Sequence, residues 1–221
     1  MKRILCLFDY IARTGYGTVS TNIVNELRKH FGQNLQLEII AINYFGQEFY
    51  EDENTKVLPV TIDEKKDSFG LYAMLKKLKT ENFDGFFTIL DLGQITPILE
   101  VVDYIRKERK EHNLKNFKII YYFPVDCALI PELTKNLEVC DLIVTYTDYA
   151  KKQIVKHRPE LLTQIKVLPH GNNFKDFYPM PKAEIEEFRK EYFEENADRF
   201  IITNVNRNQP RKFNKFDYRP N

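Results

Sequence analysis

The chain has 221 residues, and its 33 lysines and arginines nearly balance 32 aspartates and glutamates, leaving a formal charge of +1. This length suits one large domain, or one domain with part of a second. The charge balance argues against a general nucleic-acid or membrane-surface binder, because both need a basic excess on one face. The N-terminal apolar run is too short for a signal peptide, and no apolar stretch approaches the ~20 residues that span a bilayer. We therefore expect a cytoplasmic protein without a transmembrane segment.

Short apolar runs alternate with segments of helical periodicity along the chain. In chain order we expect a strand at 4–8, a glycine turn at 13–17, a helix over 19–27 that ends near Gly32, and strands at 35–42 and 57–60. Next come a helix over 71–78, a strand at 86–90, a helix over 95–109 with Pro97 in its first turn, and a strand at 117–123. Last come a short helix from Pro131, a strand at 142–146, a helix capped by Thr147 or Asp148, a strand at 165–168, a helix over 183–195 and a strand at 200–205.

This alternation indicates an α/β fold with a Rossmann-like, mostly parallel sheet and helices on both faces. Ligands of such sheets bind beyond the C-terminal ends of the strands, so we looked for chemistry there. The three cysteines lack metal-ligand spacing, and Cys6 and Cys140 lie in apolar runs, as buried small side chains do.

The first strand end is followed by Thr14-Gly15-Tyr16-Gly17. Its two glycines permit a tight turn and a close backbone approach. The helix behind them offers free N–H groups and a positive dipole end to an anion or a sugar hydroxyl. The spacing is not that of the dinucleotide-binding G-x-G-x-x-G pattern, and a plain strand-to-helix turn is the alternative.

Three later strand ends also carry candidate residues. Asp126 could contact sugar hydroxyls or a developing positive charge, or it could form a turn or cap a helix. Tyr146-Thr147 follows the next strand, and helix capping is the favoured interpretation there. His170-Gly171 ends the strand after that: His170 could titrate near neutral pH or be held in the loop by hydrogen bonds, and we expect Gly171 in a conformation closed to other residues.

Beyond the strand expected at 200–205, Arg207 and Lys212 supply a guanidinium and an ammonium group. This pair suits a diphosphate, because arginine offers a planar fork and lysine a compact charge. A solvated basic tail is the alternative.

Taken in order and spacing, these motifs resemble the N-terminal part of the retaining glycosyltransferase family four, which has the two-domain GT-B fold. The resemblance covers residues 1–212. It rests on Thr14-Gly15-Tyr16-Gly17, Tyr122-Phe123-Pro124-Val125-Asp126, Tyr146-Thr147, His170-Gly171 followed by Phe177-Tyr178-Pro179, and Arg207 five residues before Lys212. The sequence departs from the family in having no histidine in the loop after the strand that ends near Asp126, and in having Asn173 where an aspartate is usual.

The resemblance implies hexosyl transfer from a nucleotide-diphosphate sugar to an unidentified acceptor. It implies that Gly15, Tyr16 and Gly17 lie near the donor phosphates and that His170 and Gly171 contribute to donor or substrate binding. Arg207 and Lys212 would hold the diphosphate, so that no metal or other cofactor is required. Asp126 is the candidate catalytic residue.

By the same resemblance, residues 1–180 form the acceptor-side Rossmann-like domain. Residues 181–221 form a linker helix and the first strand of a truncated donor-binding domain, the rest of which is missing. We therefore expect the chain to be inactive alone, with a separate donor-binding domain as a possible partner. The alternatives are a non-catalytic ligand-binding module and a degenerate remnant of a glycosyltransferase.

Overall fold

The computed structural model describes residues 1–60, 67–171, 174–175 and 177–202. The chain divides into two compact units, residues 1–171 and residues 172–221. This division falls nine residues before the boundary expected from the sequence, after residue 180. In the described part of the chain, no helix is long and apolar enough to cross a bilayer.

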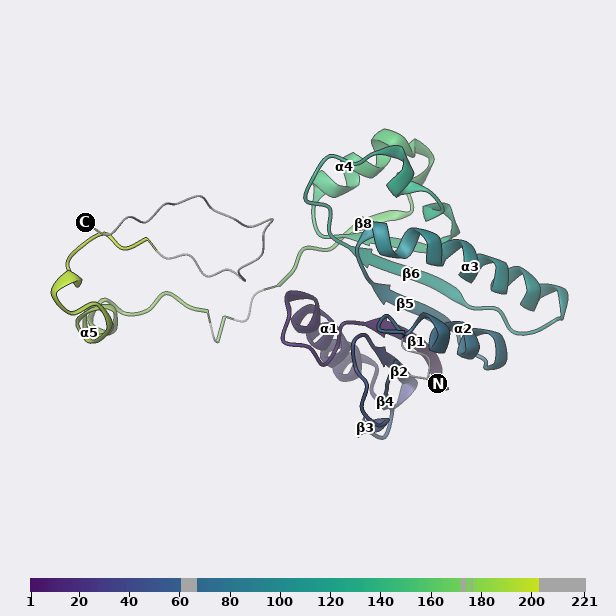
Figure 1. Ribbon diagram of the computed structural model, residues 1–221, viewed down its shortest axis with the longest axis horizontal. Helices are drawn as coiled ribbons and strands as arrows, with labels where there is room; N and C mark the ends of the chain where they lie inside the picture. Colours follow the sequence, from purple (N-terminus) through teal and green to yellow (C-terminus); the bar gives the residue numbers. More distant parts are fainter. Residues whose placement is uncertain (61–66, 172–173, 176, 203–221) are drawn as a thin grey trace. The chain divides into compact units, whose positions relative to one another are not determined.

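The first unit is built on an eight-stranded sheet in the order β3-β4-β2-β1-β5-β6-β7-β8 (Figure 1). All neighbouring strands are parallel except β3 and β4, which form an antiparallel hairpin at one edge. The strands are β1 (Lys2–Phe8), β2 (Leu35–Ala41), β3 (Phe49–Asp52), β4 (Thr55–Leu58), β5 (Gly85–Ile89), β6 (Lys118–Phe123), β7 (Leu142–Thr145) and β8 (Ile165–Val167). The expectation of an α/β fold with a mostly parallel sheet is therefore confirmed.

The described residues of this unit form four α-helices, and short 3-10 turns complete the connections between them. The helices are α1 (Gly15–Phe31), α2 (Leu71–Thr80), α3 (Leu92–Glu111) and α4 (Asp148–His157). The 3-10 turns are η1 (Gly32–Asn34), η2 (Pro131–Thr134), η3 (Leu137–Val139) and η4 (Pro159–Leu161). Gly32 closes α1 with a positive φ of 50°, a backbone angle that favours glycine.

Each face of the sheet carries its own core, because the strands are apolar on both sides. Leu5 and Leu7 of β1 pack with α2, α3 and α4, whereas Cys6 and Phe8 point to the opposite face and pack with α1. Successive side chains of a strand alternate between the two faces of its sheet. Helices therefore cover both faces.

The strand order contains a switch point between β1 and β5. The chain passes from β1 outward to β2 and β4, then returns to the other side of β1 as β5, so the connections that leave the two central strands run in opposite directions. In open α/β sheets the ligand crevice lies at the carboxyl ends of the strands at such a point. The residues that follow β1 and β5 therefore lie where a ligand is expected.

The structure of this sheet and its helices differs from the expected elements in two places. The sequence analysis missed β3, whose residues are largely exposed. Helix α3 begins three residues earlier than expected, at Leu92, so Pro97 lies in its second turn. Proline there removes one backbone donor, but it leaves the rest of the helix intact.

The second unit contains α5 (Lys182–Phe193) and the 3-10 turn η5 (Glu194–Asn196). None of the residues of α5 is buried. The strand expected at 200–205 is not present over residues 200–202, where Phe200 and Ile202 are about nine-tenths exposed. Without a neighbouring strand or a core, an apolar run has nothing to hold it in a sheet. Residues 203–205 lie outside the described residues.

Candidate functional site at the carboxyl ends of the strands

The loop after β1 is fixed by a chain of hydrogen bonds that begins at Thr14, the N-cap of α1. Its hydroxyl accepts the backbone N–H of Gly17 at 2.9 Å and donates to the carboxylate of Asp9 at 2.6 Å. Threonine at an N-cap satisfies one of the free N–H groups of a helix start. The sequence Asp9…Thr14-x-x-Gly17 thus locks the loop onto the first turn of α1.

Gly17 is required by this packing and is not open to a ligand. A Cβ atom there would lie 2.0 Å from the backbone oxygen of Ala12. Gly17 is also buried, and its N–H group is already engaged by Thr14. Gly15, by contrast, is exposed, and a Cβ atom there would meet nothing within 4 Å. Of the two glycines, Gly15 is therefore the one that a ligand can approach.

Tyr16 joins the ends of the two central strands. Its hydroxyl donates a hydrogen bond to the carboxylate of Asp91, the N-cap residue of α3, which is the second residue after β5. The pKa of the Tyr16 phenol is raised well above its usual range. Burial is the largest cause, and the hydrogen bond to Asp91 and the charge of that carboxylate come next. The phenol therefore stays protonated at neutral pH and acts as a fixed donor at the switch point.

Three rings lie at the carboxyl ends of β6, β7 and β8. We call them the strand-end aromatic cluster: Tyr122 within β6, Tyr146 after β7 and His170 after β8. The ring centroids of Tyr122 and Tyr146 lie 4.5 Å apart, and those of Tyr146 and His170 lie 3.8 Å apart. Tyr122 is anchored, because its hydroxyl donates to the backbone oxygen of Leu168 at 2.7 Å. Burial raises the pKa of Tyr122 to about 12 and that of Tyr146 above its usual range, and partial desolvation lowers the pKa of His170, so all three rings are uncharged at neutral pH.

Tyr146 connects this cluster to the Tyr16–Asp91 pair. Its pKa is raised first by burial, then by Tyr122 and by the charge of Asp91. Tyr146 and Asp126 also contribute to the raised pKa of Tyr16, after burial and Asp91. These groups thus lie close enough to act on one another electrostatically. The hydroxyl oxygen of Tyr146 is buried and has no hydrogen-bond partner in the described part of the chain.

The strand ends bring together most, but not all, of the residues that the sequence singled out. Gly15, Tyr16, Asp126 and His170 all follow strands that end at this edge of the sheet, and Asp126 is exposed. Thr147 caps α4 by accepting the N–H of Ala150 at 3.1 Å, as the favoured interpretation of that segment predicted.

Two further predictions concern Gly171 and the basic pair. Gly171 is exposed, and it is not one of the glycines with positive φ, so the expected special backbone conformation is wrong. Nothing lies within 4 Å of a Cβ atom built on it, so open space surrounds this position. Arg207 and Lys212 lie outside the described residues.

Asp91 is the site residue that the sequence analysis did not single out. It was recognised only as the end of the strand at 86–90. Its position directly after the strand beside β1 would have revealed it, had the strand order been known.

Charge at this edge is predominantly acidic. The described loops that follow β1, β5, β6, β7 and β8 (residues 9–14, 90–91, 124–130, 146–147 and 168–171) hold three carboxylates, Asp9, Asp91 and Asp126, and one cationic side chain, Arg13. Within the residues that the structure describes, no group of three or more His, Cys, Asp or Glu side chains could hold a metal ion.

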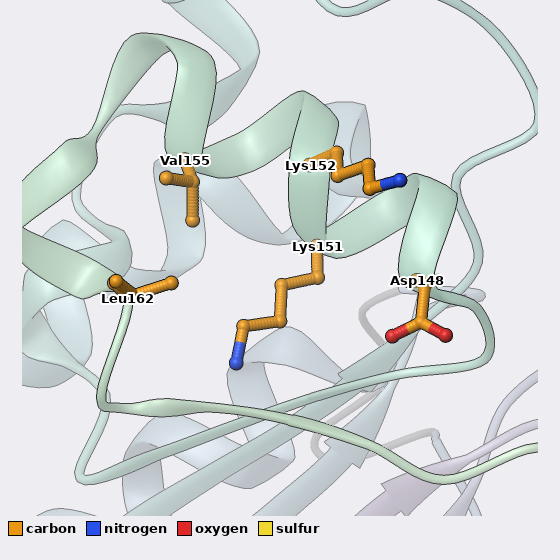
Figure 2. A pocket seen from close by; sticks show the side chains of 5 residues that line it. All are labelled: Asp148, Lys151, Lys152, Val155 and Leu162. Carbon is orange, nitrogen blue, oxygen red and sulfur yellow. The ribbon is translucent and has the colours of Figure 1, made fainter.

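A separate surface pocket of about 360 Å³ lies beside α4 (Figure 2). It is lined by Asp148, Lys151, Lys152, Val155 and Leu162. The ammonium group of Lys151 donates to the backbone oxygen of Ile165 in β8 at 3.0 Å. That lysine thus serves to fix the edge strand to α4, and the pocket takes no part in the site described above.

No protein-family model matches the chain, and the comparison with curated proteins found no match.

Proposed function

We propose that this chain is the acceptor-side half of a nucleotide-sugar-dependent glycosyltransferase of the GT-B type, which transfers a hexosyl group to a hydroxyl acceptor. The motif order in the sequence supports this proposal. The observation that carries it is the hydrogen bond from Tyr16 to Asp91 across the switch point, with the strand-end aromatic cluster at the same edge of the sheet.

Each part of this edge has a role in the proposed reaction. The exposed start of α1 at Gly15 presents a helix dipole to the donor diphosphate, which leaves with negative charge. The hydrogen bond between Tyr16 and Asp91 holds the ends of β1 and β5 in one geometry, so that the acceptor hydroxyl is positioned without reorganisation. Asp126, exposed at the end of β6, orients the attacking hydroxyl by accepting its hydrogen bond.

In this proposal, the donor is held mainly by a second domain, of which residues 181–221 are the beginning. Arg207 and Lys212 would neutralise the leaving diphosphate, as fixed cations do in sites that rely on electrostatic stabilisation. Residues 1–221 by themselves are then expected to show no turnover, because in this proposal the donor sugar and the ribose are held by the second domain.

The test joins residues 1–180 to the donor-binding domain of a characterised GT-B enzyme and measures release of nucleotide diphosphate with a panel of UDP-, GDP- and ADP-sugars. We expect release by the chimera in the presence of sugar acceptors, and none by the chain alone. An Asp91→Asn chimera should retain its fold and lose most of this activity, whereas a Tyr104→Ala chimera, changed at an exposed residue of α3, should retain it.

Turnover by the unmodified chain would refute the assignment to the acceptor side alone. A chimera that folds, but releases no nucleotide with any donor and acceptor, would refute the assignment as a glycosyltransferase.

A further inference from the structure

The chemistry of the strand ends defines the class of acceptor, if the proposed function holds. Three features of the described residues bear on it: the strand-end aromatic cluster, the hydrogen-bonding groups beside it, and the sign of the local charge.

The aromatic cluster offers an uncharged apolar surface. His170 is exposed, and its ring packs against Tyr146 with an interplanar angle of 50°. Binding sites for small molecules commonly combine aromatic walls with a few polar groups that fix the orientation of the ligand. A sugar ring suits such a wall, because its C–H groups form an apolar face and its hydroxyls project from the rim.

The polar groups beside the cluster are suited to hydroxyls. Asp91 and Asp126 are exposed carboxylates that can only accept hydrogen bonds when ionised. Tyr146 adds a buried hydroxyl without a partner in the described part of the chain, which can donate or accept. Buried polar groups are nearly always hydrogen-bonded in the functioning protein. A ligand that carries several O–H groups would donate to Asp126 and to the acceptor sites of Asp91 that Tyr16 leaves open, and would give the Tyr146 hydroxyl a partner.

The charge beside the aromatic cluster disfavours an anionic acceptor, whereas the proposed function places the donor diphosphate at the start of α1, next to Arg13. Asp9, Asp91 and Asp126 outnumber Arg13, the one cationic side chain in the described loops after β1, β5, β6, β7 and β8. Nearby carboxylates repel phosphate and carboxylate groups, and this repulsion is strongest where solvent is partly excluded. His170 does not offset it at neutral pH, because partial desolvation of its ring lowers its pKa.

We propose that the acceptor recognised at this edge is an uncharged, polyhydroxylated molecule of the neutral sugar class, stacked on Tyr146 and His170 and hydrogen-bonded by Asp126 and Asp91. This inference rests on the proposed function, but it makes a separate statement about ligand selectivity that binding alone can test.

The experiment uses the purified full chain and three pairs of probes: the methyl glycosides of glucose, galactose and mannose, and their 6-phosphates. Binding is followed by saturation-transfer NMR and by tyrosine fluorescence, which is accessible because the chain has 13 tyrosines and no tryptophan. We expect at least one neutral glycoside to bind, and its 6-phosphate to bind at least tenfold more weakly at low ionic strength. Raising the salt concentration should narrow this difference, because salt screens the repulsion.

Two variants and one control locate the site. Tyr146→Phe keeps the ring and should weaken binding of the neutral glycoside several-fold, which separates the hydroxyl from any effect on folding. Asp126→Asn should weaken neutral binding and reduce the discrimination against the phosphate. Tyr104→Ala, on α3, should bind like the unmodified chain.

Equal or tighter binding of the 6-phosphates would overturn this inference and leave the proposed function standing. Failure of every neutral glycoside to bind would also overturn it, and the chimera assay would then decide separately whether the chain belongs to a glycosyltransferase.

Discussion

Replacing Gly17 with alanine should destabilise the first unit, although alanine is the better helix former. In the structure the added Cβ atom would lie 2.0 Å from the backbone oxygen of Ala12 and 3.4 Å from that of Asp9, where ordinary van der Waals contact begins at about 3.4 Å. The loop must therefore move by more than 1 Å, against the hydrogen bonds that Thr14 makes to Asp9 and Gly17. Overpacking of this kind costs about 1–3 kcal/mol, and loss of the cap would add about 1 kcal/mol.

Urea denaturation followed by far-UV circular dichroism measures this cost. We expect Gly17→Ala to lower the free energy of unfolding by about 2–4 kcal/mol. Gly15→Ala is the matched control, because its Cβ atom meets nothing within 4 Å. That substitution should be neutral, or should stabilise by up to about 1 kcal/mol through the lower entropy of the unfolded chain. A Gly17→Ala variant as stable as the Gly15→Ala variant would refute the close approach of the loop to α1.

Three other predictions concern the stability of the same unit. Thr14→Ala should cost about 1–2 kcal/mol, since it removes the N-cap of α1, and thermal unfolding measures this effect. Arg109→Lys should lower the free energy of unfolding by about 3 kcal/mol, measured by chemical denaturation. The buried guanidinium donates to the backbone oxygens of Leu78 and Lys115 and to the side chain of Asn82, and an ammonium group cannot make all of these hydrogen bonds. Arg13→Lys, at an exposed arginine, is the control and should change the free energy of unfolding by less than about 0.5 kcal/mol. The pKa of Asp84 is lowered chiefly by the hydrogen bond from the N–H of Arg3 and then by Lys115. Its carboxylate therefore stabilises the fold fully above its pKa in the unfolded chain, near 3.9, and this stabilisation is lost as the pH falls through its lower pKa in the folded protein. Asp84→Asn should therefore flatten the fall in the urea midpoint below about pH 4, and an unchanged acid profile would contradict the assignment.

The regular elements of the sheet were predictable from the sequence because their own residues carry the signal. Strands β1 and β2 are apolar on consecutive positions, which is typical of a parallel strand covered on both faces. Strand β3 gave no such signal, because its residues face solvent. It is held by its pairing with β4 and by ion pairs from Arg28 to Glu51 and Asp52, more than 20 residues away in sequence.

The same distinction applies to the site. The glycine turn, Asp126 and His170 could be found as strand-end residues, but the hydrogen bond from Tyr16 to Asp91 joins positions 75 residues apart. The sequence around Tyr16 and the sequence around Asp91 do not predict this hydrogen bond, since it depends on β5 lying beside β1 in the sheet. Gly171 shows the opposite failure: its residue type suggested a special backbone angle, and the surrounding loop does not require one.

The uneven anchoring of the helices has a consequence for the dynamics of the chain. Helix α1 buries Gly17, Ser20 and Val24, whereas α3 buries seven of its residues. Elements with few buried contacts open at a lower free-energy cost than the rest of a domain. The amides of α1 should therefore exchange with deuterium well before those of α3, and each such opening would carry Tyr16 away from Asp91 while the sheet stays closed. Ligand occupancy would then be registered first as slower exchange in that one helix.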